Sequence, residues 1–256
     1  MSNREVTNGE RPTSPAGAPA AAAAARDHDV ELLLNGRLHD PRRVLGAHAR
    51  GAKETRVRVL LPSARRVRLV EPAVELDRVL GTPLFEWTGP KRLVKSPYRL
   101  RWETHDGAWH ESYDPYSFPP LIDVSDLARF AAGSHVHAHR FLGAHALTID
   151  GVPGVRFAVW APNAERVSVV GAFNHWDGRY HPMTARGDSG VFELFLPGLG
   201  AGELYKYEIF TRDSRELKLK TDPYGAAFEN RPATAAVTTA APAFRWDDGE
   251  WLSARR

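Results

Sequence analysis

The chain has 256 residues, 25% of them charged and 43% hydrophobic, and its formal net charge is +3. This length suits two domains of ~100–150 residues, and glycine and proline stay below the ~25–30% typical of a low-complexity coil. The small charge excess gives little support to nucleic-acid binding, and no apolar run reaches the ~18–20 residues of a membrane-spanning helix. Because cysteine is absent, disulfides and thiolate metal sites are excluded, and we expect a cytoplasmic protein.

The chain begins with an Ala/Pro-rich tail that cannot bury a core, so we expect residues 1–26 to be disordered. This tail lacks the basic start and the large apolar centre of a signal peptide. A short helix is predicted from His28 to Asn35, because Asp27 suits an N-cap and Gly36 suits a helix stop.

Residues 27–125 are predicted to form a first β-sandwich. Apolar residues alternate with charged ones there, which is typical of antiparallel strands with one solvent-exposed face. Such strands are expected at Thr55–Leu61, Arg66–Val70 and Tyr98–Glu103. Turn residues lie outside these strands, at Pro62–Ser63, Thr88–Pro90 and Asp106–Gly107.

A linker is predicted over residues 126–140, where a helical run from Asp126 to Ala132 ends at Gly133. A second sandwich is expected over residues 141–241, followed by a connector over residues 242–256. Its strands are predicted at Gly154–Trp160, Arg166–Val170, Val191–Leu196, Leu204–Phe210 and Glu216–Lys220. Closely spaced strands without long helices predict an all-β fold of two tandem immunoglobulin-like β-sandwiches with short connecting helices.

The two predicted sandwiches repeat each other in sequence. Motifs recur in the same order at offsets of about 97 to 108 residues, which chance explains poorly. The matching pairs are Val44–His48 with Phe141–His145, Arg56–Val70 with Arg156–Val170, and Asp114–Tyr116 with Asp222–Tyr224. The chain is therefore predicted to be two copies of one sandwich of ~100 residues.

The second copy resembles the glucan-binding module that precedes the catalytic barrel in α-1,4-glucan branching enzymes. The motifs that carry the resemblance are FLGAH at 141–145, GVRFAVWAPNAERVSVVGAFNHWDG at 154–178, LYKYEI at 204–209 and LKTDPYG at 219–225. With the diverged copy in front of it, the chain resembles the longer N-terminal form of bacterial glycogen branching enzymes.

This resemblance implies a non-catalytic part of an enzyme that cleaves α-1,4 bonds and forms α-1,6 branches during glycogen biosynthesis. Family members continue into a (β/α)₈ barrel of ~250 residues, whose pattern this sequence does not show. We therefore expect no catalytic residue here and no activity of the chain alone. The expected partners are α-1,4-glucan or glycogen and the catalytic barrel of the parent enzyme, with no cofactor, metal, nucleic acid or membrane. The alternative is a stand-alone glycogen-targeting scaffold without enzyme activity.

The candidate glucan site is centred on Trp176. An Asp-Gly pair follows this residue and suits a tight hairpin, which would lift the indole to a loop tip where it can stack on a glucose ring. Asn174 is expected to hydrogen-bond sugar hydroxyls, and Lys206 to supply a charged donor. The resemblance implies a matching Trp and Lys and a second Trp in the loop before the Asp-Pro pair, but residues 212–217 contain no aromatic residue. Packing of Trp176 against neighbouring loops or against the catalytic barrel of the parent enzyme therefore remains the alternative.

Two further groups of residues have both a chemical and a structural interpretation. His135, His137 and His139 alternate and can ligate a metal from one side of an extended segment, whereas an exposed linker is the simpler interpretation. Asp114 and Asp222 provide two carboxylates, but retaining glycoside hydrolysis needs them only ~5–5.5 Å apart, so a structural turn in each sandwich is favoured.

Basic and imidazole residues of the repeats also have a simple structural explanation. Arginines alternate with Val and Leu in the first sandwich, which favours a solvated strand face over a phosphate-binding patch. These arginines are Arg56, Arg58, Arg65, Arg66 and Arg68. His48 and His145 recur at equivalent places, so we expect a shared structural hydrogen bond.

Overall fold

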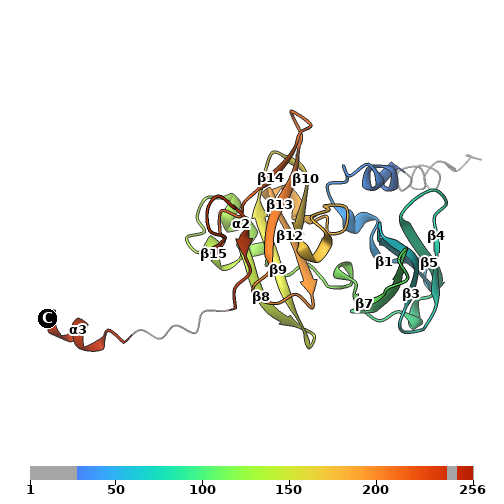
Figure 1. Cartoon of the computed structure of the whole chain (residues 1–256), viewed down its shortest axis with the longest axis horizontal. Coiled ribbons are helices and arrows are strands. Elements are labelled where there is room, and N and C mark those ends of the chain that lie inside the picture. The colour runs from blue at the N-terminus through green and yellow to red at the C-terminus, as the bar shows by residue number, and fades with distance from the viewer. Residues whose placement is uncertain (1–27, 241–246, 256) are drawn as a thin grey trace, which may run out of the picture.

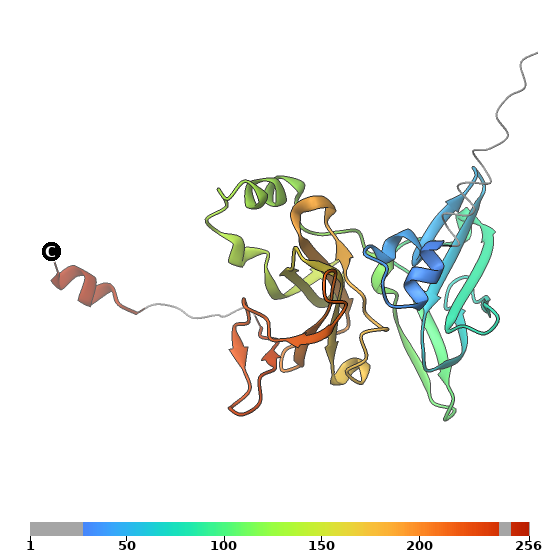
Figure 2. The same cartoon turned by 90° about the horizontal axis from the view of Figure 1, so that it is seen from above.

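The structure is a computed structural model in which residues 28–240 and 247–255 are described. Two β-structured bodies lie side by side in both views (Figure 1, Figure 2). This architecture confirms the predicted all-β, sandwich-like fold with short connecting helices. The predicted disordered tail, the predicted helix cap Asp27, residue 241 at the end of the predicted second sandwich and residues 242–246 of the predicted connector lie outside the described residues. Helix α3 (Gly249–Ala254) lies in the described part of the connector.

The first body is a seven-stranded antiparallel sheet in the order β1-β2-β5-β4-β3-β6-β7. Apolar side chains of β2 and β5 pack against those of β3 and β6, so the sheet closes over its own core, with Val57, Val67, Leu69, Phe85 and Leu100 buried inside. The strands are β1 (Gly46–Arg50), β2 (Glu54–Leu60), β3 (Ala64–Leu69), β4 (Glu75–Arg78), β5 (Leu84–Pro90), β6 (Arg99–Thr104) and β7 (Trp109–Tyr113).

The second body has two sheets. One has the order β11-β12-β9-β8, and the other has the order β10-β13-β16-β15 with β14 added beside β13. Phe157 of β9 and Tyr205 of β13 contact edge to face in the core between them, at 4.9 Å between ring centroids. The strands are β8 (Gly143–Ile149), β9 (Val152–Trp160), β10 (Ala164–Gly171), β11 (Thr184–Ala185), β12 (Val191–Pro197), β13 (Leu204–Thr211), β14 (Leu217–Lys220), β15 (Ala227–Phe228) and β16 (Ala236–Val237).

Strand order and backbone irregularities repeat between the two bodies. The path β1-β2-β5-β4 of the first corresponds to β8-β9-β12-β11 of the second. The register shifts between Ala64 and Arg66 where β3 pairs with β6, and between Ala164 and Arg166 where β10 pairs with β13. Because the strand order and the register shifts occur at equivalent places in both bodies, they support the prediction that the chain contains two copies of one sandwich.

The N-terminal helix covers residues 28–34 within the described part of the chain. It ends at the predicted stop: the Arg37 amide donates to the Leu32 carbonyl at 2.8 Å, and the Gly36 amide donates to Leu33 at 3.0 Å. Gly36 has φ +65°, a left-handed conformation that glycine adopts without steric cost.

The two bodies share one apolar core. Leu33, Leu45 and Tyr116 from the N-terminal half are buried in the same cluster as Phe157 and Phe192 of the second sandwich. The helix at the start of the chain lies on the side of the first body that faces the second (Figure 2). Burial of these apolar side chains, in addition to the covalent connection through the linker, holds the two sandwiches together.

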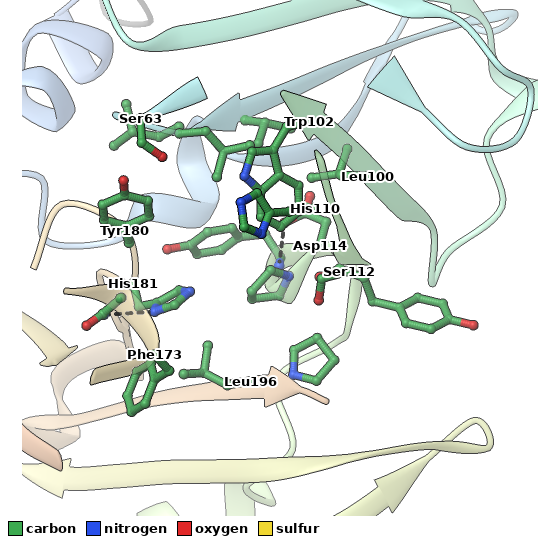
Figure 3. A pocket seen from close by; sticks show the side chains of 18 of the residues that line it. Ser63, Leu100, Trp102, His110, Ser112, Asp114, Phe173, Tyr180, His181 and Leu196 are labelled. Atoms are coloured by element: carbon green, nitrogen blue, oxygen red, sulfur yellow. Dashed lines mark hydrogen bonds between the residues drawn. The ribbon is translucent and has the colours of Figure 1, made fainter. Parts of the chain in front are cut away.

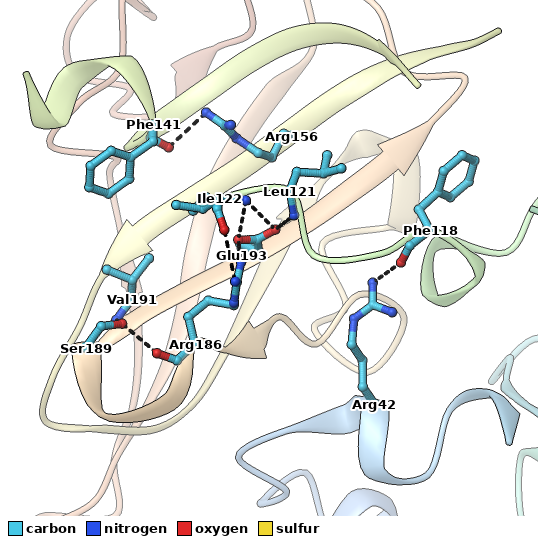
Figure 4. A network of polar contacts seen from close by, with 10 residues as sticks. All are labelled: Arg42, Phe118, Leu121, Ile122, Phe141, Arg156, Arg186, Ser189, Val191 and Glu193. Carbon is cyan, nitrogen blue, oxygen red and sulfur yellow. Dashed lines mark hydrogen bonds and ion pairs between the residues drawn. The ribbon is translucent and has the colours of Figure 1, made fainter. Parts of the chain in front are cut away.

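The segment just before helix α2, at the end of the predicted first sandwich, is fixed to the second sandwich by a buried carboxylate (Figure 4). The backbone amides of Leu121 and Ile122 donate to Glu193, and Arg186 forms an ion pair with the same carboxylate. The Arg186 guanidinium also donates to the Ile122 carbonyl at 3.0 Å. Helix α2 (Val124–Ala131) follows and begins two residues earlier than predicted, because the Asp123 side chain caps it by accepting from the Ser125 amide.

Short 3-10 helices connect several of these elements: η1 (Pro41–Arg43), η2 (Lys91–Leu93), η3 (Pro115–Ser117), η4 (Ala138–Arg140), η5 (Ala172–Asn174) and η6 (Gly187–Ser189). None of the helices within the described ranges has both the length and the apolar character needed to cross a membrane.

One predicted turn is wrong. Thr88–Pro90 lies inside β5, where it pairs with residues 54–56 of β2. A Cβ atom at Gly89 would approach the ring of Trp87 to 2.2 Å, so glycine is needed there for close packing of the indole and not for a turn. All eight strands predicted from alternation are present, and each observed end lies within two residues of the predicted end.

Candidate functional site

Trp176 lies in the loop that follows β10, and its side chain is partly exposed, at 39%. The predicted tight hairpin is absent: His175 and Trp176 adopt φ of +57° and +58°, and the Trp176 amide donates to the Gly171 carbonyl at 2.9 Å. Asp177 then bonds Arg179 at 2.6 Å, and Gly178 packs so tightly against Glu208 that a Cβ atom would lie 2.1 Å from its carboxylate. The loop is therefore held by contacts to the sheet and by turns of its own, such as the bond from the Tyr180 amide to the Asp177 carbonyl at 3.3 Å, and not by a hairpin.

Asn174 is buried beneath this loop, with 2% exposure. Its Oδ1 accepts from the Gly171 amide, and its Nδ2 donates to the Val169 carbonyl and to His181 Nδ1, each at 2.9 Å. Both amide hydrogens are used, so Asn174 has none left to donate to a sugar hydroxyl. The structure instead gives it a positioning role for the loop that carries Trp176.

Lys206 lies on β13, directly opposite Val170 of β10. Its ammonium donates to the Thr234 hydroxyl at 2.8 Å. The neighbouring pair along the strands is Gly171 with Tyr205, and Gly171 is the residue whose carbonyl accepts from the Trp176 amide. Trp176 and Lys206 are thus attached to the same end of the β10–β13 pair.

Strand β14 adds an apolar edge next to this region. Leu217 and Leu219 are more than half exposed, at 57% and 54%. Leu219 is paired with Glu208, which shares a strand face with Lys206 two residues away. The alternation of this strand indicates a half-buried sheet, whereas all four of its residues are exposed because β14 lies at the sheet edge.

The two repeated aspartates perform the same local task in separate sandwiches. Asp114 accepts a hydrogen bond from the Tyr98 hydroxyl at 2.6 Å, and Asp222 accepts one from the Tyr205 hydroxyl at 2.7 Å. Each also accepts from the backbone amide two residues later. Burial raises the pKa of Asp114 to about 6 and raises the pKa of Asp222. These contacts confirm the structural turn expected in each sandwich.

The histidine pattern also has structural partners. His135 bonds Asp126 at 3.0 Å, and within the described part of the chain no group of three or more His, Cys, Asp or Glu side chains is arranged to hold a metal ion. His48 Nε2 bonds the Leu45 carbonyl at 3.0 Å, and His145 Nε2 bonds the Leu142 carbonyl at 2.9 Å. The shared hydrogen bond expected from the repeat is confirmed.

Four of the five arginines singled out in the first sandwich lie beside a carboxylate or an aromatic ring: Arg56, Arg58, Arg66 and Arg68. Arg58 pairs with Glu86 at 3.0 Å, and Arg66 forms an ion pair with Glu75. The Arg68 guanidinium lies 5.9 Å from the centre of the Trp109 ring. These contacts favour the strand-face interpretation over a phosphate-binding patch.

Two aromatic residues near Trp176 were missed by sequence reasoning. Tyr180 and His181 follow in the same loop, and His181 is the partner of Asn174. The available signal was the density of aromatic and imidazole residues between 173 and 181.

Two family models match this chain. Residues 141–225 match carbohydrate-binding module 48, the isoamylase N-terminal domain, and residues 26–116 match the N-terminal domain of the alpha-1,4-glucan branching enzyme GlgB. Trp176, Asn174 and Lys206 all lie in the first of these ranges.

Curated relatives extend the match to nearly the whole chain. A 1,4-alpha-glucan branching enzyme GlgB of Nitrosococcus oceani is 46% identical over 93% of this chain, and one of Cellvibrio japonicus is 44% identical over 89%. The chain spans 32% of the length of each. Among solved structures, a pullulanase of Klebsiella oxytoca aligns with 76% of this chain and 21% of its own, at 21% identity and a TM-score of 0.33. The chain therefore belongs to the GlgB branching-enzyme family and corresponds to its N-terminal region, an N-terminal domain followed by a carbohydrate-binding module 48.

Proposed function

We propose that this chain is the non-catalytic, glucan-binding and positioning part of a branching enzyme that cleaves α-1,4 bonds and forms α-1,6 branches in glycogen. The family match and the position of Trp176 support this proposal. The observation that carries it is a partly exposed indole on a fixed loop, within the range that matches a carbohydrate-binding module. The proposed partners are an α-1,4-glucan and the catalytic barrel of the same enzyme, in the cytoplasm.

The proposed surface consists of Trp176 and Lys206, and Asn174 supports it from beneath. Each of the three residues has a separate task. The exposed indole of Trp176 covers the apolar C–H face of a glucose ring, and such stacking contributes roughly 0.5–1.5 kcal/mol beyond area burial. Lys206 supplies a charged donor to sugar hydroxyls from the adjacent strand. Asn174 keeps the loop in place through its three internal hydrogen bonds.

The test is affinity gel electrophoresis of the chain in soluble glycogen. We expect a dissociation constant nearer ~1 mM than ~1 µM, because a single tryptophan supplies the stacking surface. Trp176→Ala should remove most of the retardation, and Lys206→Ala should reduce it less. Added salt should change little, since a neutral polymer releases no counterions on binding.

Trp109 offers a matched control, because it is a similarly exposed tryptophan, at 43%, on the first sandwich. Trp109→Ala should migrate like the parent chain. If a folded Trp176→Ala chain is retarded as strongly as the parent, this surface is not the glucan site.

A further inference from the structure

A cavity of about 390 Å³ lies between the two sandwiches (Figure 3). Its first wall contains Trp102 and His110 of the β6–β7 hairpin, and its second contains Tyr180 and His181 from the loop that carries Trp176. We propose that this cavity is a second carbohydrate site, which binds a short neutral α-glucan segment between the sandwiches. The choice of a glucan as the ligand rests on the proposed function.

The first wall offers a flat aromatic surface. Trp102 and His110 are directly paired across the hairpin, and their rings stack at 5.5 Å with 20° between planes. Tyr180 and His181 lie across the cavity from this pair (Figure 3). Flat rings in a small cavity suit the apolar faces of a pyranose ring, and the volume falls in the range of ~300–1,000 Å³ found for small-molecule sites.

The second wall offers a fixed hydrogen-bond donor. Asn174 donates to the Val169 carbonyl and accepts from the Gly171 amide, which settles the orientation of its side-chain amide. His181 Nδ1 must then accept from Asn174 Nδ2, so the ring hydrogen lies on Nε2. Burial lowers the pKa of His181 to about 4, which keeps the imidazole neutral. Among the described residues, Nε2 has no hydrogen-bond partner and is free for a ligand.

Two hydroxyls complete the polar lining. Ser63 and Tyr180 line the cavity, and their side-chain hydroxyls have no hydrogen-bond partner within residues 28–240 and 247–255. A hydroxyl both donates and accepts, as sugar hydroxyls do. The cavity thus combines flat apolar faces with unpaired neutral polar groups.

The part of the lining that the structure describes offers neither Lys nor Arg to hold an anion. The one carboxylate among these described residues, Asp114, is bonded to Tyr98 and to the Tyr116 amide. A phosphate or carboxylate ligand would have to be desolvated without an opposite charge, which is costly. The lining therefore favours a neutral saccharide over a sugar phosphate.

The direct test labels the full chain with 5-fluorotryptophan and follows its ¹⁹F NMR signals during titration with maltotriose. The chain has seven tryptophans, and Trp102→Phe and Trp176→Phe variants identify the two signals of interest. We expect the Trp102 signal to shift saturably with maltotriose, both in the parent chain and in Trp176→Ala.

Ser63→Phe is the matched blocking variant, because it fills the cavity without removing a described hydrogen bond. It should abolish the maltotriose-dependent shift of the Trp102 signal and leave that of Trp176 intact, with the remaining tryptophan signals showing that the chain is folded. Glucose 1-phosphate serves as the anionic probe and should shift the Trp102 signal less than maltotriose does.

The outcomes separate the two proposals. If maltotriose shifts the Trp176 signal but not that of Trp102, the cavity site is refuted and the proposed surface stands. If neither signal moves and glycogen does not retard the chain, both proposals fail. A stronger response of Trp102 to glucose 1-phosphate than to maltotriose would overturn the assignment to a neutral saccharide.

Discussion

The hydroxyl of Tyr116, at the end of the first sandwich, donates to the carbonyl oxygen of Pro182 in the second sandwich at 2.7 Å, and the contact is buried. Pro182 also forms an isolated bridge with Ser168 of β10. This bond ties the repeated Asp-Pro-Tyr turn of one sandwich to the loop that carries Trp176 in the other. The arrangement of the two sandwiches and the shape of the candidate site are therefore linked.

Tyr116→Phe tests that link. The substitution leaves the Pro182 carbonyl buried without its donor, which costs about 1–3 kcal/mol in the free energy of unfolding. We expect a lower melting temperature in calorimetry with a single transition retained. Tyr113→Phe is the control, because the Tyr113 hydroxyl has no hydrogen-bond partner among the described residues. Equal losses in the two variants would show that the bond to Pro182 contributes nothing.

Mild proteolysis tests how the two sandwiches are joined. The first cuts should fall within residues 132–139, where six of the eight residues are exposed and Val136 reaches 83%. The two fragments should still elute together in size-exclusion chromatography, because Leu45 and Tyr116 are buried in a core shared with Phe157. First cuts inside β9 or β10 would contradict the predicted linker, and separate elution would contradict the shared core.

Glu193→Ala should destabilise the chain more than any exposed ion-pair variant. The substitution removes the acceptor for the Leu121 and Ile122 amides and leaves Arg186 buried without its partner. Breaking a buried ion pair in this way costs roughly 3–5 kcal/mol. Chemical denaturation would measure it.

The comparison variant for this ion pair is Glu75→Ala, since Glu75 pairs with Arg66 on the surface and each side chain is more than half exposed. Its expected cost is about 0–1 kcal/mol. Similar midpoints for the two variants would refute the structural role of Glu193.

Asp114 predicts a pH dependence of stability. Burial raises its pKa to about 6 in the folded chain from an ordinary value of 3.8. Between these values the folded state holds a proton on Asp114 that the unfolded state has released, so the contribution of Asp114 to the free energy of unfolding should fall as pH rises from about 4 to 6. His181, whose pKa is lowered to about 4, contributes in the opposite direction over this range. The contribution of Asp114 is on the order of 2 kcal/mol. Compared with the parent chain, Asp114→Asn should lack this contribution to the slope of thermal stability against pH across that range.

Asp106 supplies the opposite case on an exposed turn. Hydrogen bonds from the Thr104 hydroxyl and the Ala108 amide lower the pKa of Asp106. The contribution of Asp106 to stability is therefore present at pH values above its ordinary pKa of 3.8 and is lost as the pH falls below that pKa. Asp106→Asn should therefore leave the slope between pH 4 and 6 in place. An unchanged slope in Asp114→Asn would show that another group causes it.

Local pattern was enough to predict much of the fold. Alternation along Thr55–Leu61 and Gly154–Trp160 predicts strands because side chains of a strand point to opposite faces at every second residue. Gly36 and Gly133 predict helix ends because both adopt positive φ. The repeated Gly-Ala-His and Asp-Pro-Tyr motifs also predict the second copy, since each motif makes the same hydrogen bonds close to itself in the chain.

Contacts that depend on the three-dimensional arrangement decided the rest. An Asn next to an exposed Trp has the same sequence signature whether it faces a sugar or lies buried, and only the bonds of Asn174 to Val169 and His181 distinguish the two. Thr88–Pro90 has the composition of a turn but is part of a strand because β2 pairs with it. The cavity between Trp102 and His181 exists only because the two sandwiches bury a common apolar surface, and that packing depends on shape complementarity across the chain, which no local periodicity encodes.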